Sequence, residues 1–331
     1  MTVTRRIALG GAIALATAAP AVLGDNALRT ATTIAYMGLF AVSFNLLFAQ
    51  AGLLSLGHNA ALGVGGYAFA LLALGTTGLH PLLALLGALA AGTLIGALVG
   101  TVCARMRGSQ LALMTLALSQ LLHALAVKWR SVTHGDDGMI VPLSRPLFAA
   151  LPGLVLDDAR VAYAITLVVL VAALALTWRL LHTPLGQGFR LLRDNEERAA
   201  FLGYHVGGLR VALFSYAGAL AGLAGGLLVM CQGLISPEAL GLQLGGEVIF
   251  MALLGGAQSF LGPLVGAGLF TLLEDLLSAW TPHWLLLIGL LFVAAVLFAP
   301  QGLAGLVELL RGFRAGAVDR SRTPASGAQE A

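Results

Sequence analysis

Long stretches of this chain carry no charged residue, and they constrain its fold more than any other feature. Among them are residues 31–102, 161–177, 211–237 and 280–306. A helix needs about 20 apolar residues to cross about 30 Å of hydrocarbon. Backbone amides find no water there, so a spanning segment must be a helix or part of a closed barrel. Barrel strands alternate polar and apolar residues, whereas these stretches are apolar at nearly every position, which indicates helices.

The composition supports a chain that is largely covered by lipid. Of its 331 residues, 59% are hydrophobic and only 10% are charged. A soluble domain carries about 25% charged residues, because its surface faces water. We therefore predict an all-α fold, a polytopic membrane helix bundle with about ten transmembrane helices (eight to ten).

The uncharged stretches and their flanks divide into ten predicted helices. These lie at 7–24, 31–50, 54–75, 82–103, 109–127, 160–181, 209–232, 244–260, 262–279 and 284–300. Glycines and a proline at 255–263 leave open whether the eighth and ninth are two helices or one kinked segment. The first follows Arg5 and Arg6, and it is either a retained helix or a cleaved signal peptide.

Arginine and lysine concentrate in cytoplasmic loops of membrane proteins, so their distribution predicts orientation. With the N-terminus inside, thirteen of the 18 basic residues fall on the cytoplasmic side and five outside. Both termini are then cytoplasmic. The transmembrane domain covers 1–311, with an external loop at 128–158 and a cytoplasmic loop at 182–208. The small, polar segment 312–331 is predicted to be a flexible cytoplasmic tail.

The chain cannot contain a phosphate-binding loop, because the G-x-x-x-x-G-K-[ST] pattern requires a lysine after glycine. Its single lysine, Lys128, follows alanine and valine. ATP-driven transport would therefore need a separate ATPase. The two cysteines, Cys103 and Cys231, lack metal-ligand spacing, and we interpret them as small core residues. No bound cofactor, metal or nucleic acid is expected for this chain.

The cytoplasmic loop contains a predicted short helix. Asp194 can cap it, and Glu197 three residues later can complete a capping box. Gly203 suits the left-handed conformation that ends a helix. Ala199 and Ala200 are expected on its surface, where small side chains let another protein approach closely. The alternative is an ordinary solvated loop helix.

This loop, an arginine-rich segment followed by Ala-Ala-x-x-Gly, resembles the coupling segment of LivM-type permease subunits of branched-chain amino acid ABC importers. Three further stretches are similar to that family's motifs, and together the four cover about residues 31–306. They are Asn45–His58 followed by Gly65-Gly66-Tyr67; Gly135-Asp136-Asp137-Gly138 after Trp129 and Thr133; and Gly246–Ala267 with Phe298–Leu303. The resemblance implies a type II ABC importer-like permease fold.

The resemblance also implies partners and a location. The partners are a second homologous, LivH-like permease, two ABC ATPase subunits that use ATP and Mg²⁺, an external substrate-binding protein and a small amino-acid solute. The chain would be a multi-pass protein in the lipid of the bacterial inner membrane. His134 stands where the family usually has glycine, and Ala49-Gln50 where it often has Gly-Tyr. These departures leave the solute open.

The resemblance assigns two groups of candidate site residues. Those for ATPase coupling are Arg190, Arg193, Asn195, Glu197, Ala199, Ala200 and Gly203. Those of the external loop are Thr133, Gly135, Asp136, Asp137 and Gly138.

Polar residues in apolar surroundings are candidates for the translocation path. A broken helix exposes backbone groups that can line such a path, and an intramembrane carboxylate must face protein or water. The candidates are Asn45, Ser55, His58, Asn59 and Glu247. Each could instead be a hydrogen-bonded structural residue.

Two glycine ladders, each with a four-residue period, are predicted to pack helices closely. They are Gly92, Gly96 and Gly100, and Gly218, Gly222 and Gly226. Whether they meet helices of this chain or of the partner permease is open.

Three functions compete at this stage. The first is a permease subunit of an ATP-driven importer for branched-chain or related hydrophobic amino acids. The second is a permease of the same family for urea or short amides. The third is an ion-coupled secondary transporter, for which Glu247 is the one candidate ionisable group in mid-membrane. An enzyme is not expected, because no serine elbow, His-x-x-x-His pair or paired carboxylate site is present, and no residue is assigned a catalytic role.

Overall fold

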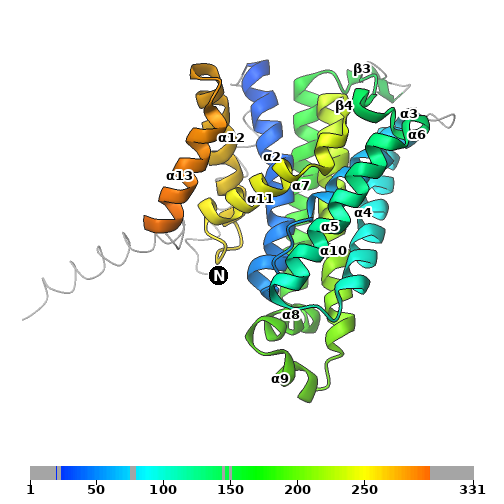
Figure 1. The fold of residues 1–331 in the computed structure, drawn as a ribbon. Helices are drawn as coiled ribbons and strands as arrows, with labels where there is room; N and C mark the ends of the chain where they lie inside the picture. Colours follow the sequence, from blue (N-terminus) through cyan, green and yellow to red (C-terminus); the bar gives the residue numbers. More distant parts are fainter. Residues whose placement is uncertain (1–19, 21–23, 75–79, 144–145, 149–150, 299–331) are drawn as a thin grey trace, which may run out of the picture.

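The computed structural model describes residues 20, 24–74, 80–143, 146–148 and 151–298. All but residues 20 and 24 of the predicted helix at 7–24, and the whole predicted tail at 312–331, lie outside the described residues. The rest is a bundle of helices, as predicted (Figure 1).

Six helices of the described part are long and apolar enough to cross a membrane. They are α2 (Asp25–Asn45) with its π-helical extension η1 (Leu46–Gln50), α4 (Pro81–Cys103), α5 (Gly108–Lys128), α7 (Ala159–Leu181), α10 (Val206–Gln232) and α12 (Gly262–Trp280). Three apolar helices are shorter: α3 (Asn59–Leu74), α11 (Leu242–Gly255) and α13 (Trp284–Phe298). Nine of the ten predicted helices therefore have a counterpart, although α3 starts five residues later than expected, because residues 51–58 are not helical apart from Ala51.

The structure separates α11 from α12 by a turn, so the segment at 244–279 is two helices. Gly256 has φ +94°, a backbone conformation that residues other than glycine rarely adopt. Pro263 then occupies the first turn of α12, where its missing N–H is not needed.

The two glycine ladders face each other across α4 and α10, which answers the question that the sequence left open. A Cβ atom at Gly92 would overlap the carbonyl oxygen of Gly218, and one at Gly222 would overlap that of Ala88. On another face of α10, a Cβ at Gly225 would overlap the carbonyl oxygen of Leu62 in α3. Backbone contact of this kind is the usual way for membrane helices to associate.

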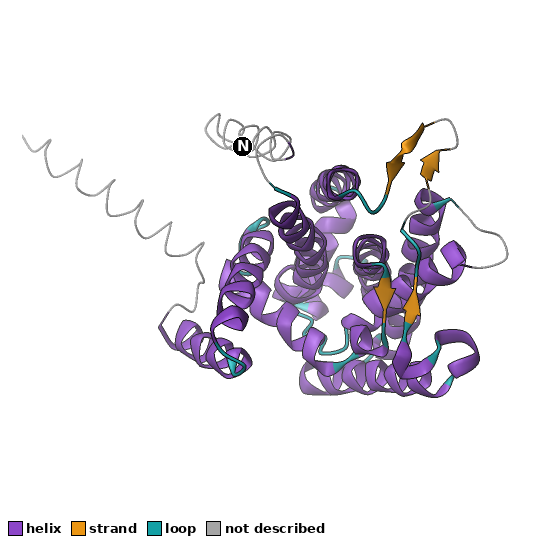
Figure 2. Ribbon diagram, turned by 90° about the horizontal axis from the view of Figure 1, so that it is seen from above, coloured by secondary structure: helices purple, strands orange, loops and turns teal. Residues whose placement is uncertain are grey.

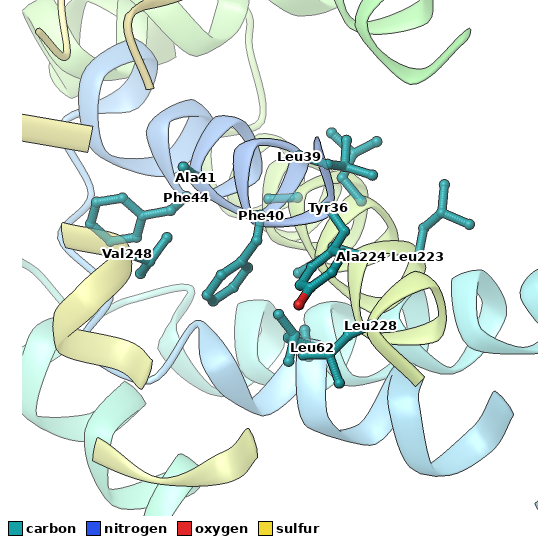
Figure 3. Packing of buried hydrophobic residues seen from close by; sticks show 14 of the residues in the cluster. Tyr36, Leu39, Phe40, Ala41, Phe44, Leu62, Leu223, Ala224, Leu228 and Val248 are labelled. Atoms are coloured by element: carbon teal, nitrogen blue, oxygen red, sulfur yellow. The ribbon is translucent and has the colours of Figure 1, made fainter. Parts of the chain in front are cut away.

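The apolar core lies where α10 packs on α2 and α3 and where α2 packs on α11. Figure 3 shows it as a cluster of aromatic and aliphatic side chains. Its labelled members are Tyr36, Leu39, Phe40, Ala41, Phe44, Leu62, Leu223, Ala224, Leu228 and Val248. Helix α2 also packs on α7 and α12, so it joins the α11–α12–α13 group to the rest of the bundle.

The loop at 128–158, predicted to be external, contains more structure than predicted. Helix α6 (Arg130–Thr133) and η2 (Gly135–Asp137) precede β1 (Met139–Ile140), which pairs antiparallel with β4 (Leu234–Ile235) beyond α10. Strand β2 (Pro146–Phe148) pairs antiparallel with β3 (Leu151–Val155). Figure 2 shows these strands from above.

Replacing Gly222 by alanine is expected to destabilise the chain by about 1–3 kcal/mol, because the added methyl group overlaps the α4 backbone. Thermal unfolding of the purified protein in detergent measures this. The matched control is Gly289→Ala in α13, where a Cβ would have no atom within 4 Å. Equal melting temperatures for the two variants would show that the ladder contact is not tight.

Candidate functional site

The loop at 182–208, predicted to be cytoplasmic, forms two helices, α8 (Pro184–Asp194) and α9 (Glu196–Phe201), beyond one end of the bundle (Figure 1). The predicted capping box at Asp194 and Glu197 is wrong, because Asp194 is the last residue of α8. Asn195 caps α9 instead: its backbone is extended, and its side-chain oxygen accepts a hydrogen bond from the Arg198 N–H at 3.0 Å. Thr183 and Pro184, which begin α8, were the signal missed in the sequence.

The end of α9 presents apolar side chains to the outside. Gly203 follows in the left-handed conformation expected of it, with φ +85°. Ala200 is exposed, but Ala199 is fully buried, which corrects the prediction that both lie on the surface. Phe201 is 91% exposed and Leu202 is 62% exposed. Sequence reasoning missed these two, because the loop also contains the adjacent apolar pair Leu191 and Leu192 and nothing in the sequence distinguishes the two pairs.

A charged cluster fixes the start of α9 to the bundle. Glu196 pairs with Arg210 of α10 and with Arg107, whose Nε lies 2.8 Å from the carboxylate. Arg210 is 1% exposed, and it also donates to the carbonyl oxygens of Ala104 at 2.9 Å and Met106 at 2.6 Å. Arg210 was counted above only as a topology signal. In the structure it joins α9 and α10 to the end of α4.

The other predicted coupling residues divide into exposed and engaged ones. Arg190 and Glu197 are exposed on α8 and α9. Arg193 instead points back to the bundle: its Nη1 donates to the carbonyl oxygen of Ala49 at 2.7 Å and to the Gln258 side chain at 3.3 Å.

Four of the five predicted path residues, Asn45, Ser55, His58 and Asn59, are buried inside the chain. Asn59 donates to the carbonyl oxygen of Gly241 at 2.8 Å and accepts from the Ser119 hydroxyl at 3.1 Å. Asn45 donates to the carbonyl oxygen of Ala257 at 3.0 Å. These bonds connect the break between α2 and α3 to the segments that flank α11.

His58 belongs to the same region and is held on two sides. Its Nε2 lies 2.8 Å from the Ser43 hydroxyl oxygen, and its ring stacks on Phe40 with centroids 5.7 Å apart. The Ser43 hydroxyl donates its one proton to the Phe40 carbonyl oxygen at 2.6 Å. His58 Nε2–H is therefore the donor to Ser43.

Glu247 lies on α11 and is half-buried. It accepts a hydrogen bond at 3.1 Å from Gln243, one turn earlier in the same helix. This bond stays within α11, whereas the bonds of Asn45, His58 and Asn59 join different elements.

The external motif is a tightly held turn. Buried Thr133 donates to the carbonyl oxygen of Ala126 at 2.6 Å, and the Gly135 N–H donates to its hydroxyl at 3.3 Å. His134 stands where the family usually has glycine. Its φ is +62°, a backbone conformation that glycine adopts without strain. Asp136 and Asp137 are exposed, whereas Gly135 and Gly138 are buried.

Replacing Glu196 by alanine is expected to lower stability by about 3 kcal/mol, because it leaves the buried Arg210 guanidinium without its carboxylate. Thermal unfolding in detergent measures the loss. Glu197→Ala serves as the control, because it removes an exposed carboxylate from the neighbouring residue. Its melting temperature should equal that of the unmodified chain. A Glu196→Ala variant as stable as this control would contradict a structural role for the cluster.

The chain resembles known proteins over most of its length. Residues 26–296 match the family described as branched-chain amino acid transport system / permease component. The permease protein LivM of the high-affinity branched-chain amino acid transport system of Escherichia coli K12 is 28% identical over 326 residues, which cover 91% of this chain and 75% of LivM. LivM of Salmonella typhimurium matches equally well. The LivH permease of Escherichia coli K12 is 29% identical over 147 residues, 44% of this chain and 47% of LivH. The chain therefore belongs to the permease component family of branched-chain amino acid transport systems; it is a multi-pass membrane transport subunit and not an enzyme.

Proposed function

We propose that this chain is the permease subunit of an ATP-driven importer for branched-chain or related hydrophobic amino acids, and that it forms the translocation path with a second, LivH-like permease. The family match supports the permease role, and the names of the LivM and LivH relatives support the solute class and the pairing. Family membership also favours this function over an ion-coupled secondary transporter.

The observation that carries the proposal is the apolar tip at the end of α9. Phe201 and Leu202 are exposed at the far end of a loop whose base is anchored by the Glu196 ion pairs. Exposed apolar side chains next to one another are typical of protein–protein contacts. Because this chain has no phosphate-binding loop, the partner at the tip would be one of two separate ABC ATPases, which use ATP and Mg²⁺.

Energy would pass between the subunits without a covalent step. The ATPase can shift the permease between outward-open and inward-open states only if it binds the loop differently in the two states. The anchored base of α9 supports this mechanism, since a loop fixed to α4 and α10 would move together with them.

The opposite end of the bundle would receive the external binding protein. Helix α6 and strands β3 and β4 lie at this end, and α8 and α9 lie at the other (Figure 1). Exposed Asp136 and Asp137, on a turn fixed by Thr133, offer a rigid acidic surface. With the excess of arginine on the α8–α9 side, this supports cytoplasmic termini. The family match supports the remaining part of the proposal, a chain of about ten spans in the bacterial inner membrane.

Replacing Phe201 by glutamate is expected to lower the amount of ATPase that co-purifies with the chain by about tenfold or more, because a charge replaces the apolar contact. Uptake and stimulated ATP hydrolysis should fall with it. Phe201→Leu, which keeps an apolar side chain, should retain most of the binding. Quantitative mass spectrometry of the complex in mild detergent measures the subunit ratio.

The end of α9 gives a second test. Proline at position 203 cannot adopt φ +85°, so Gly203→Pro should leave membrane insertion unchanged but abolish uptake and ATPase stimulation. Uptake at the unmodified rate in either Phe201→Glu or Gly203→Pro would remove the basis for assigning α9 to the ATPase.

A further inference from the structure

Two of the interruptions between helices lie next to each other and next to α8. The first is the segment 51–58 between η1 and α3, and the second is the turn 256–261 between α11 and α12. Asn45, the last residue of α2 ahead of the first break, donates from its side chain to the carbonyl oxygen of Ala257 in the second at 3.0 Å. Arg193 lies beside both: it donates to Ala49 of η1, just before the first break, and to Gln258 in the second.

The bond to Ala49 meets a specific need of the first break. The last carbonyl groups of a helix have no partner within it, and the negative end of the helix dipole attracts a cation there. At the end of η1, the carbonyl oxygens of Leu47 and Phe48 accept bonds from the Leu53 and Gly52 N–H groups. Ala49 is 4% exposed, and its carbonyl oxygen accepts from Arg193 at 2.7 Å, the length of a charge-assisted bond.

The aliphatic part of Arg193 packs on the same break. Gly52 ends η1 with φ +68°, and a Cβ atom placed there would lie 3.5 Å from Cγ of Arg193. The side chain therefore contacts the break with both its stem and its guanidinium. Its bond to Gln258 is longer, at 3.3 Å, and lies at an exposed position.

The cytoplasmic loop is thus attached to two different parts of the bundle. Through Glu196 and Arg210, α9 is fixed to α4 and α10, which are locked together by their glycine ladders. Through Arg193, α8 is fixed to the two breaks. When the loop moves together with the α4–α10 pair, Arg193 would therefore pass this movement to the breaks.

We infer that Arg193 is a positioning residue that links the cytoplasmic loop to the two helix breaks and makes them the inner gate of the path, and that it is not a binding contact for the ATPase. This inference rests on the proposed function. It replaces the expectation from the sequence that Arg193 belongs to the ATPase-facing group, because the guanidinium that would face the partner is bonded to Ala49.

The test uses the full complex of this chain with its partner permease, ATPases and binding protein, reconstituted in liposomes. Arg193→Ala should keep the unmodified subunit ratio and hydrolyse ATP within about twofold of it, while uptake per ATP falls by about tenfold. Arg193→Lys should recover part of the uptake, because an ammonium group can still donate to Ala49 but cannot also reach Gln258 in the same geometry. Gln258→Ala should lose less uptake than Arg193→Ala.

Arg179→Ala, which removes an exposed arginine near the cytoplasmic end of α7, is the matched control and should change none of these quantities. Loss of ATPase subunits from the Arg193→Ala complex would overturn the inference and return Arg193 to the ATPase-binding group. Unchanged uptake per ATP, or an Arg193→Lys variant no better than Arg193→Ala, would also overturn it. Failure of the proposed function itself would look different, since the unmodified complex would then show no ATP-dependent uptake.

Discussion

Every backbone amide and carbonyl within hydrocarbon needs a partner inside the protein, and this requirement shapes the chain most clearly where its helices stop. At the break after α2, side chains from distant helices supply the missing partners. Thr115 of α5 accepts from the Leu56 N–H at 3.1 Å, and Arg193 of α8 donates to Ala49. Asn59 donates to the Gly241 carbonyl ahead of α11. Each bond completes the backbone locally and also ties two elements together.

The same bonds change how the buried polar residues should be interpreted. Asn59 and His58 use their hydrogen-bonding groups within the chain, on Gly241, Ser119 and Ser43. Asn45 has one group to spare, since its Oδ1 is buried without a partner in the described part of the chain. A role for these residues in the path stays a prediction. Their bonds indicate that they would act first by holding the breaks in shape.

Much of the fold could be predicted because its signals are local. Uncharged stretches of about 20 residues predict spanning helices wherever they pack. The late start of α3 was missed because the stretch remains apolar through the break. The cap of α9 was predicted one residue too early, because Asp194 and Asn195 are both good cap residues. Asp194 is excluded only because α8, which begins after Thr183, continues through it.

The sequence could not show how deeply a side chain is buried or which distant residues and helices contact each other. Arg210 looks like any arginine at a membrane boundary, yet it is almost completely buried against Glu196. Ala199 and Ala200 are chemically identical neighbours, and only the packing of α9 on the bundle distinguishes them. The glycine ladders identify two small-residue faces, but their meeting depends on the arrangement of α4 and α10, which are more than 100 residues apart.

The central claim is that the chain moves its solute only when a separate ATPase acts on it through the cytoplasmic loop. The most direct measurement is uptake of radiolabelled leucine into liposomes that contain either this chain alone or the complete complex. Each kind of liposome is prepared with and without ATP on the side of the membrane that the ATPases face. The account predicts accumulation by the complete complex with ATP and none in the other three conditions. Full-rate, nucleotide-free accumulation by the purified chain alone would contradict it.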